Sequence, residues 1–304
     1  MGTRRGGRSH DRDRQGDLPV SDVLWFNGRF TTTDERVLGV EDRGFQFGDA
    51  VYEVFKFLRK RPIFLLEHFR RLQQGLQKIE IPVPWDESSF QETIRELLDR
   101  TSFADGIVYI QVSRGEAQRA HFWPDDMTPT AIAYSRAFKF PDAAKKERGI
   151  RVITTPDHRW HYCSVKSNNL LANALAKKQA QRATADEAIV LSDDGFVREG
   201  ASSSFFAVKN GRLVTYPLQD CILPGVVRDR VLDLALSARI PVDERPLREA
   251  ELFDLDEAFI TSTTQGVMPI SEIDGRIIGN SRRGEVTTRV QELFDELERE
   301  AASS

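Results

Sequence analysis

Two residues of the chain could together carry out chemistry on an aldehyde. Lys166 stands just ahead of an apolar helical stretch, and Glu199 stands at the end of a predicted strand. An amine forms a Schiff base with an aldehyde, and a carboxylate can hold a proton on a pyridine nitrogen so that the ring accepts electrons. We therefore expect a pyridoxal 5′-phosphate enzyme, with Lys166 as the catalytic residue and Glu199 as a cofactor-binding residue.

Further side chains could bind anions or line the same site. Arg71 falls near the edge of the core-facing side of a helix expected from about residue 67, where it could grip a phosphate or form a surface salt bridge. Arg119 and His121 alternate by two. On extended backbone both would point the same way and suit a carboxylate, and a solvated basic loop fits the spacing equally well. Tyr52 lies within a predicted strand, where its hydroxyl reaches a partner or the ring packs in the core.

Two segments of the second half could hold a phosphate group. A predicted helix begins after Gly225, so the free backbone amides of Val226 and Val227 would form an anion site. Ser262 and Thr263 supply hydroxyls after a predicted strand. Each segment also fits an ordinary cap or turn. The sequence contains no Walker loop, no HExxH, no paired CxxC and no Rossmann glycine fingerprint, and no metal site is expected.

The composition is that of a soluble protein with a sizeable core. Apolar residues make up 40% and charged residues 30% of the 304 residues, and the formal net charge is −4. This balance does not favour nucleic-acid binding, and no run approaches the roughly 20 apolar residues of a membrane helix. The two cysteines imply no disulfide framework, so a reducing cytoplasm is the expected compartment.

Hydrophobic patterning predicts an α+β fold in both halves. The first half should contain strands at 23–30 around an Asn-Gly turn, at 50–58 with 64–66 as its partner, at 107–112 and at 131–134, and helices from about 67 and around 90–98. The second half should contain strands at 151–154, 187–191, 204–208 and 257–261, and helices at 169–182, after Gly225, and at the end of the chain. That last helix carries an apolar stripe of Val286, Val290, Leu293 and Leu297.

The same patterning predicts two domains. Residues 1–20 are expected to be a disordered tail, since residues 1–17 are rich in Gly, Arg and Asp and lack the apolar run of a secretory signal. An N-terminal α/β domain should cover 21–136 and a C-terminal, cofactor-binding α/β domain 150–304. Charge and one proline mark 137–149 as the linker between them.

These segments, in this order, resemble the fold-type IV pyridoxal phosphate enzymes, the class IV aminotransferases, and within them the D-amino-acid aminotransferases. The resemblance covers residues 23–297. It is carried by Asp42-Arg43-Gly44-Phe45-Gln46-Phe47-Gly48-Asp49, Glu67-His68 with Arg71-Leu72, Arg119-Ala120-His121, Lys166-Ser167 with Asn169-Leu170-Leu171, Glu199-Gly200, and Ser262-Thr263-Thr264. It implies a two-domain fold with the cofactor at the domain interface. The implied reaction moves an amino group between D-amino acids such as D-alanine and 2-oxo acids such as 2-oxoglutarate or pyruvate.

The resemblance also implies roles for individual residues. Lys166 would form the Schiff base and shuttle the proton, and Glu199 would bind the ring nitrogen. The phosphate would be bound by Arg71, by the amides of Val226 and Val227, and by Ser262 and Thr263. Tyr52 would line the site near the lysine. Arg119 and His121 would bind the substrate carboxylate from the partner subunit of a homodimer, and Arg159 would lie near the lysine.

Three positions depart from the pattern of the family. Val227 stands where a threonine is common, which removes one side-chain hydrogen bond of ~1 kcal/mol to the phosphate. Ser204 replaces an asparagine, and Ala201 replaces a serine or threonine. These changes affect cofactor contacts rather than the reaction class.

Other functions share part of the pattern. Branched-chain L-amino-acid aminotransferases, aminodeoxychorismate lyases and R-selective amine transaminases share the lysine and the acid, and Arg119-Ala120-His121 favours the D-amino-acid enzymes. A non-catalytic pyridoxal phosphate-binding protein is the alternative from another class. The presence of both Lys166 and Glu199 disfavours it, since capture of the phosphate needs neither residue.

Overall fold

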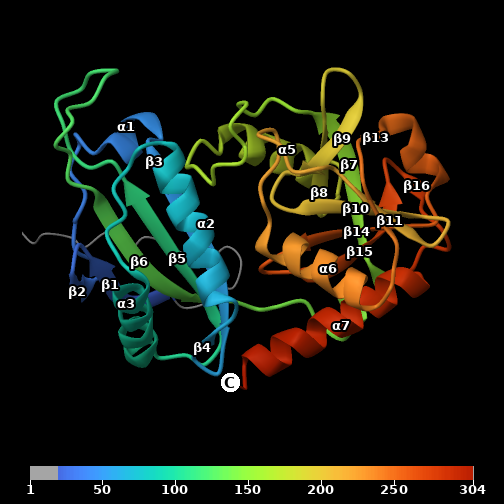
Figure 1. The fold of residues 1–304 in the computed structure, drawn as a ribbon, viewed down its shortest axis with the longest axis horizontal. Coiled ribbons are helices and arrows are strands. Elements are labelled where there is room, and N and C mark those ends of the chain that lie inside the picture. The colour runs from blue at the N-terminus through green and yellow to red at the C-terminus, as the bar shows by residue number, and fades with distance from the viewer. Residues whose placement is uncertain (1–19, 304) are drawn as a thin grey trace, which may run out of the picture.

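The computed structural model describes residues 20–303, which form two β-sheets with helices packed against them (Figure 1). This is the mixed α+β architecture predicted from the sequence. The predicted tail, residues 1–20, lies outside the described residues except for Val20. No helix in residues 20–303 has both the length and the apolar character needed to cross a bilayer.

The first sheet has six strands in the order β2-β1-β6-β5-β3-β4. Its strands are β1 (Val20–Phe26), β2 (Arg29–Thr32), β3 (Ala50–Leu58), β4 (Arg61–Pro62), β5 (Gly106–Ser113) and β6 (Thr130–Ala137). The short helix α1 (Arg43–Phe47) precedes β3, and α2 (Leu65–Lys78) and α3 (Glu87–Arg100) pack on one face. Phe69, Leu72 and Leu76 of α2 are at most 1% exposed, so the predicted helical face is the buried one.

The prediction that residues 64–66 pair with β3 is wrong, because the strands that pair with β3 are β4 and β5. Arg59 and Lys60 between these strands have φ values of 50° and 62°, the conformation of a tight two-residue hairpin. Phe64, at φ 55°, directly precedes α2. The chain therefore turns back earlier than the apolar pattern suggested.

The second sheet has ten strands in the order β12-β11-β10-β14-β15-β7-β8-β9-β13, with β16 paired to β15. They are β7 (Ile150–Pro156), β8 (Glu187–Leu191), β9 (Phe196–Gly200), β10 (Ser204–Lys209), β11 (Arg212–Thr215), β12 (Val242–Glu244), β13 (Leu247–Arg248), β14 (Glu257–Ser262), β15 (Gly266–Ile273) and β16 (Arg276–Ile277). The helices of this half are α5 (Leu171–Arg182), α6 (Val226–Ser237), the 3-10 helix η1 (Glu249–Asp254) and α7 (Glu285–Ala301).

Both faces of the second sheet are apolar. Along β10, Phe205 belongs to a cluster formed mostly by strand residues, and Phe206 belongs to a second cluster that includes residues of α6 and α7. Successive side chains of a strand point to opposite faces, so this alternation places a core on each side of the sheet. The helices α6 and α7 cover one of these cores.

The helix α7 joins the two halves. Its C-terminal end reaches the edge of the first sheet near β4 (Figure 1), where Lys56 of β3 lies 2.6 Å from Glu298. The predicted stripe of Val286, Val290, Leu293 and Leu297 is partly wrong. Val290 is fully buried, but the buried side of the helix is centred on Val290 and Phe294, and the other three residues of the stripe are half-buried.

Within residues 20–303 the strands of one sheet do not pair with those of the other. The change of sheet falls between β6 and β7, and the segment between them contains the helix α4 (Ala143–Arg148). We keep the division into domains at 21–136 and 150–304, with 137–149 as the linker, as a proposal.

Candidate active site

A cavity of about 420 Å³ lies between the two halves of the molecule. The first half contributes Tyr52 and Val54 from β3 and Arg71 from α2, and the second half contributes the remaining wall. The wall includes most of the residues singled out from the sequence: Tyr52, Arg71, Arg159, Lys166, Glu199, Val226, Val227, Ser262 and Thr263.

Lys166 is fixed beside the start of β3. Its carbonyl accepts a hydrogen bond from the Tyr52 amide (2.9 Å), and Ser167 forms an isolated bridge with Val51. The segment before α5 therefore lies along β3 like a short extra strand. As a result Lys166 Nζ lies 3.2 Å from the Tyr52 hydroxyl and 4.3 Å from the centre of its ring.

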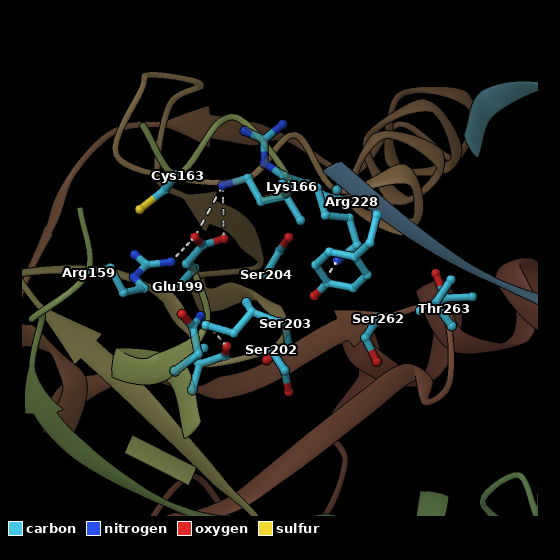
Figure 2. A pocket seen from close by; sticks show the side chains of 18 of the residues that line it. Arg159, Cys163, Lys166, Glu199, Ser202, Ser203, Ser204, Arg228, Ser262 and Thr263 are labelled. Carbon is cyan, nitrogen blue, oxygen red and sulfur yellow. Dashed lines mark hydrogen bonds and ion pairs between the residues drawn. The ribbon is translucent and has the colours of Figure 1, made fainter. Parts of the chain in front are cut away.

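Glu199 lies at the end of β9 with its side chain 5% exposed. Arg159 donates to its Oε1, and the Leu223 amide lies 3.2 Å from each carboxylate oxygen. Burial raises the pKa of the Glu199 carboxyl, and the positive charge of Arg159 opposes this effect. Figure 2 shows Arg159 and Glu199 together on one side of the cavity, with Ser262 and Thr263 on the opposite side.

Arg71 is part of a buried polar cluster and not of a surface salt bridge. Its Nε and Nη2 donate to Glu53 of β3 at 2.7 and 2.8 Å, and its Nη1 donates to the Pro224 carbonyl at 3.0 Å. His68 lies 2.7 Å from the same carboxylate, and both Glu53 and His68 are 1% exposed. Although burial acts to raise it, the charge of Arg71 holds the pKa of Glu53 well below its usual range.

The side of the cavity facing α6 and β14 presents donors to an anion. Gly225 precedes α6 and has no side chain that could accept hydrogen bonds from the first amides of the helix. A bound anion would therefore not compete with a capping side chain for these amides. A Cβ added at Gly225 would lie 2.7 Å from Ser204 Oγ, so a larger residue would crowd this wall. Thr261 Oγ1 is buried without a hydrogen-bond partner among the described residues.

Arg119 and His121 do not line this cavity. They lie in an exposed loop after β5 whose backbone bends at both residues, so of the two alternatives that the spacing left open the structure has the loop and not the extended backbone. Arg119 donates to Gln46 at 3.3 Å and lies over the ring of Phe47. Arg43 holds the loop in place by donating to the Ala120 carbonyl at 2.7 Å.

A family model described as amino-transferase class IV matches residues 50–273, which is more than half of the chain. The chain belongs to the class IV aminotransferases. Its resemblance to that family, drawn above from sequence motifs, is thereby confirmed. This class IV aminotransferase is 39% identical over 266 residues to a D-alanine aminotransferase from Bacillus licheniformis, a match that covers 88% of this chain and 93% of that protein.

Solved structures agree on the fold. A branched-chain amino acid aminotransferase from Escherichia coli matches with a TM-score of 0.85 at 26% identity, over 91% of this chain and 95% of that one. A branched-chain aminotransferase from the thermophilic archaeon Thermoproteus uzoniensis, solved with norvaline, matches with a TM-score of 0.83 at 26% identity, over 90% and 93%. The fold-type IV architecture expected from the motifs is therefore confirmed for this class IV aminotransferase.

The sequence reading of this class IV aminotransferase missed several residues that shape the site. Glu53 and Asp157 bind Arg71 and Arg159, two of the three arginines that line the cavity, and the third, Arg228, is part of its wall. Glu187, fully buried, accepts hydrogen bonds from the hydroxyls of Ser202 and Ser203 in the turn after Glu199. Figure 2 shows these two serines side by side. For Asp157 a signal was available in the sequence, because this acidic residue stands only two positions before Arg159, a predicted site residue.

Proposed function

We propose that this class IV aminotransferase binds pyridoxal 5′-phosphate in the cavity through Lys166 and transfers an amino group between D-amino acids, such as D-alanine, and 2-oxo acids, such as 2-oxoglutarate or pyruvate. The observation that carries this proposal is the meeting of Lys166, Glu199 and Arg71 at one cavity, although they come from a loop, a strand and a helix. The 39% identity to a D-alanine aminotransferase supports the substrate class.

The residues of the cavity fit this cofactor. Its two ends differ in chemistry, since one offers the carboxylate of Glu199 and the other offers the start of α6 and the hydroxyls of Ser262 and Thr263. The hydroxyl of Thr261, buried at the second end and without a hydrogen-bond partner within residues 20–303, would gain an acceptor from a phosphate. Val226 and Val227 would act there through their amides, because Val227 packs its side chain into the core with Phe206.

The chain's own residues would perform the proton transfers. When bound, the cofactor supplies an aldehyde carbon that takes up the amino group and a ring that withdraws electrons from Cα of the amino acid. Nζ of Lys166 would take the proton from Cα of the amino acid and would return a proton to the carbon that receives the amino group. The Tyr52 hydroxyl, 3.2 Å from Nζ, orients that amine. Glu199 would hold a proton on the ring nitrogen, and Arg71 would bind the phosphate.

The test is pyruvate formation from D-alanine and 2-oxoglutarate by the protein loaded with cofactor. Lys166→Ala should abolish turnover and the visible absorbance of the lysine-bound cofactor, whereas the control Lys178→Ala, on the exposed side of α5, should behave as the wild type. Transamination by the Lys166→Ala variant would refute the proposal. Rates with L-leucine and with a simple amine, measured in parallel, distinguish D-amino-acid transfer from the other activities of the family.

We also propose that the active unit is a homodimer in which Arg119 and His121 bind the substrate carboxylate of the partner subunit. Both side chains are exposed and lie outside their own cavity. Large apolar side chains on α1, on the loop that carries Arg119, and at the start of α5 are also exposed, as at Phe45 (76%), Phe122 (78%) and Leu171 (75%). Apolar side chains gathered in this way are typical of a protein interface.

Mixing two variants, one without the catalytic lysine and one with weakened substrate binding, tests this arrangement. Arg119→Ala should raise KM for D-alanine tenfold or more, since an arginine–carboxylate contact contributes ~1.5–3 kcal/mol. If Arg119 acts in the partner's site, exchange of subunits between Lys166→Ala and Arg119→Ala should restore about a quarter of the sites. If subunit exchange is verified and no activity returns, Arg119 acts in the site of its own subunit or in neither site.

The remaining proposal concerns the compartment. Cys163 and Cys221 are both free thiols, and Cys163 is buried. Free cysteines without a disulfide fit a reducing environment, so we propose the cytoplasm.

A further inference from the structure

The acidic residue Asp157 is built into the wall behind Glu199. It directly follows β7, and its amide donates to the Leu191 carbonyl (2.8 Å), which continues the pairing of β7 with β8. Its side chain is 1% exposed and is absent from the lining of the cavity. Asp157 therefore acts on a bound group only through its neighbours.

Those neighbours are two arginines. Arg159 donates to Asp157 through Nε (2.9 Å), Nη2 (2.9 Å) and its backbone amide (3.0 Å), and Arg198 donates through Nη1 (2.8 Å). Although burial acts to raise it, these hydrogen bonds hold the pKa of the Asp157 carboxyl below its ordinary value. Asp157 is therefore a fixed negative charge.

The other contacts of Arg159 determine which of its nitrogens binds Glu199. A guanidinium has an edge formed by Nε and one Nη, which suits a carboxylate bidentately. In Arg159 this edge faces Asp157, and Nη2 also donates to the Cys221 carbonyl (3.2 Å). Only Nη1 reaches Glu199, and it contacts Oε1 alone (Figure 2). The other oxygen, Oε2, receives only the Leu223 amide at 3.2 Å among the hydrogen bonds seen in residues 20–303.

The four charges also compensate one another. Arg159 and Arg198 are positive, and Asp157 and Glu199 are negative, so the cluster has no net charge. Without Asp157 the cluster would carry one positive charge beside Glu199. Such a charge disfavours a protonated pyridine nitrogen nearby.

We propose that Asp157 is a positioning residue with two effects. It turns Arg159 so that Oε2 of Glu199 receives no arginine hydrogen bond and can accept one from the ring nitrogen of the cofactor, and its negative charge offsets the charge of the two arginines. This inference rests on the proposed function, because it requires the cofactor to bind with its ring nitrogen at Glu199. It adds a residue outside the cavity that controls the proton at that nitrogen.

The experiment compares two probes on the apo full-length protein: pyridoxal 5′-phosphate, and its 1-deaza analogue with a carbon in place of the ring nitrogen. The ratio of their dissociation constants measures how strongly the site favours the protonated nitrogen. In Asp157→Asn the preference for the natural cofactor should fall by about tenfold, because one unit of charge changes near the nitrogen. Arg198→Met removes a positive charge from the same cluster, so in this variant the preference for the natural cofactor should stay equal or rise.

A purely structural role for Asp157 would weaken the binding of both probes equally and leave the ratio unchanged, which would overturn the proposal. A fall of the ratio in Arg198→Met as large as in Asp157→Asn would overturn it as well, because the two substitutions change the charge in opposite directions. The exposed-turn variant Asp274→Asn, which removes an acid that binds Thr154, is the matched control and should leave the ratio unchanged. If the wild type itself shows no preference, the assignment of Glu199 in the proposed function fails instead.

Discussion

Replacing Glu53 with glutamine should destabilise the protein by about 3–5 kcal/mol. Glu53 is 1% exposed and receives two hydrogen bonds from Arg71, at 2.7 and 2.8 Å, while His68 lies 2.7 Å away. Glutamine keeps the shape of the side chain but not its charge. Arg71 would then remain charged in a buried position without a counter-ion, and the new amide group would face N–H donors.

The destabilisation should depend on pH in a defined direction. The positive charge of Arg71 lowers the pKa of Glu53 below its ordinary value of 4.5, against the effect of burial. A carboxyl with a lowered pKa in the folded state contributes stability that is present above the unfolded-state pKa and is lost as the pH falls towards the folded-state pKa. The difference between wild type and Glu53→Gln should therefore shrink by about 1 kcal/mol between pH 7 and pH 4.

Urea unfolding of the apo protein at both pH values measures this difference. The matched control is Glu67→Gln, on the same helix as Arg71, since Glu67 is 29% exposed and lies 3.9 Å from Arg230. That control should change the free energy of unfolding by less than about 1 kcal/mol. A loss below about 1 kcal/mol for Glu53→Gln at pH 7, or an equal loss at both pH values, would refute the reasoning.

Two other predictions concern buried groups outside the reaction. Lys56 and Glu298 are 8% and 11% exposed, so Glu298→Leu should lower the free energy of unfolding by about 3–5 kcal/mol, and the double variant Lys56→Met/Glu298→Leu should recover most of that loss. A double variant no more stable than the single one would contradict this account. Burial raises the pKa of Cys163 to about 11, so in a Cys221→Ser variant at pH 8 a thiol reagent should react roughly 200-fold more slowly than with free cysteine. Rapid labelling of the folded variant would show that Cys163 is accessible as a thiolate.

Long elements with a strong hydrophobic period could be predicted from the sequence. Phe90, Ile94, Leu97 and Leu98 were expected on one face of a helix, and all four are at most 2% exposed in α3. The bounds of β3 agree with the predicted strand at 50–58. In these segments local periodicity and burial favour the same structure, so no information from distant residues is needed.

Segments whose conformation depends on distant contacts could not be predicted in this way. Arg59 and Lys60 adopt positive φ in the turn between β3 and β4, and their residue types do not predict this conformation. The loop carrying Arg119 bends because Arg43, about eighty residues earlier, binds its carbonyls. Spacing by two residues has no structural meaning where the backbone is not a strand.

The candidate site, too, could be predicted from the sequence only in part. Lys166, Glu199 and Arg71 were identified from motifs, and the structure brings them to one cavity. The partner of Arg71 was not identified, because Glu53 precedes it by eighteen residues on another element. Motifs reveal the residues that a reaction requires, whereas the residues that orient them depend on which elements pack together.

Arg71 and Arg159, two of the three arginines that line the cavity, are paired with buried carboxylates, and this pairing determines what the cavity can recognise. Arg71 is neutralised by Glu53, and Arg159 is shared between Asp157 and Glu199. The walls therefore offer few uncompensated charges and many N–H groups held in fixed directions. Because a fixed donor needs no reorganisation when a ligand binds, selectivity in such a cavity comes from the placement of donors and acceptors. Buried carboxylates behind Arg71 and Arg159 keep those donors in place, so residues without direct contact to a ligand determine the geometry of its site.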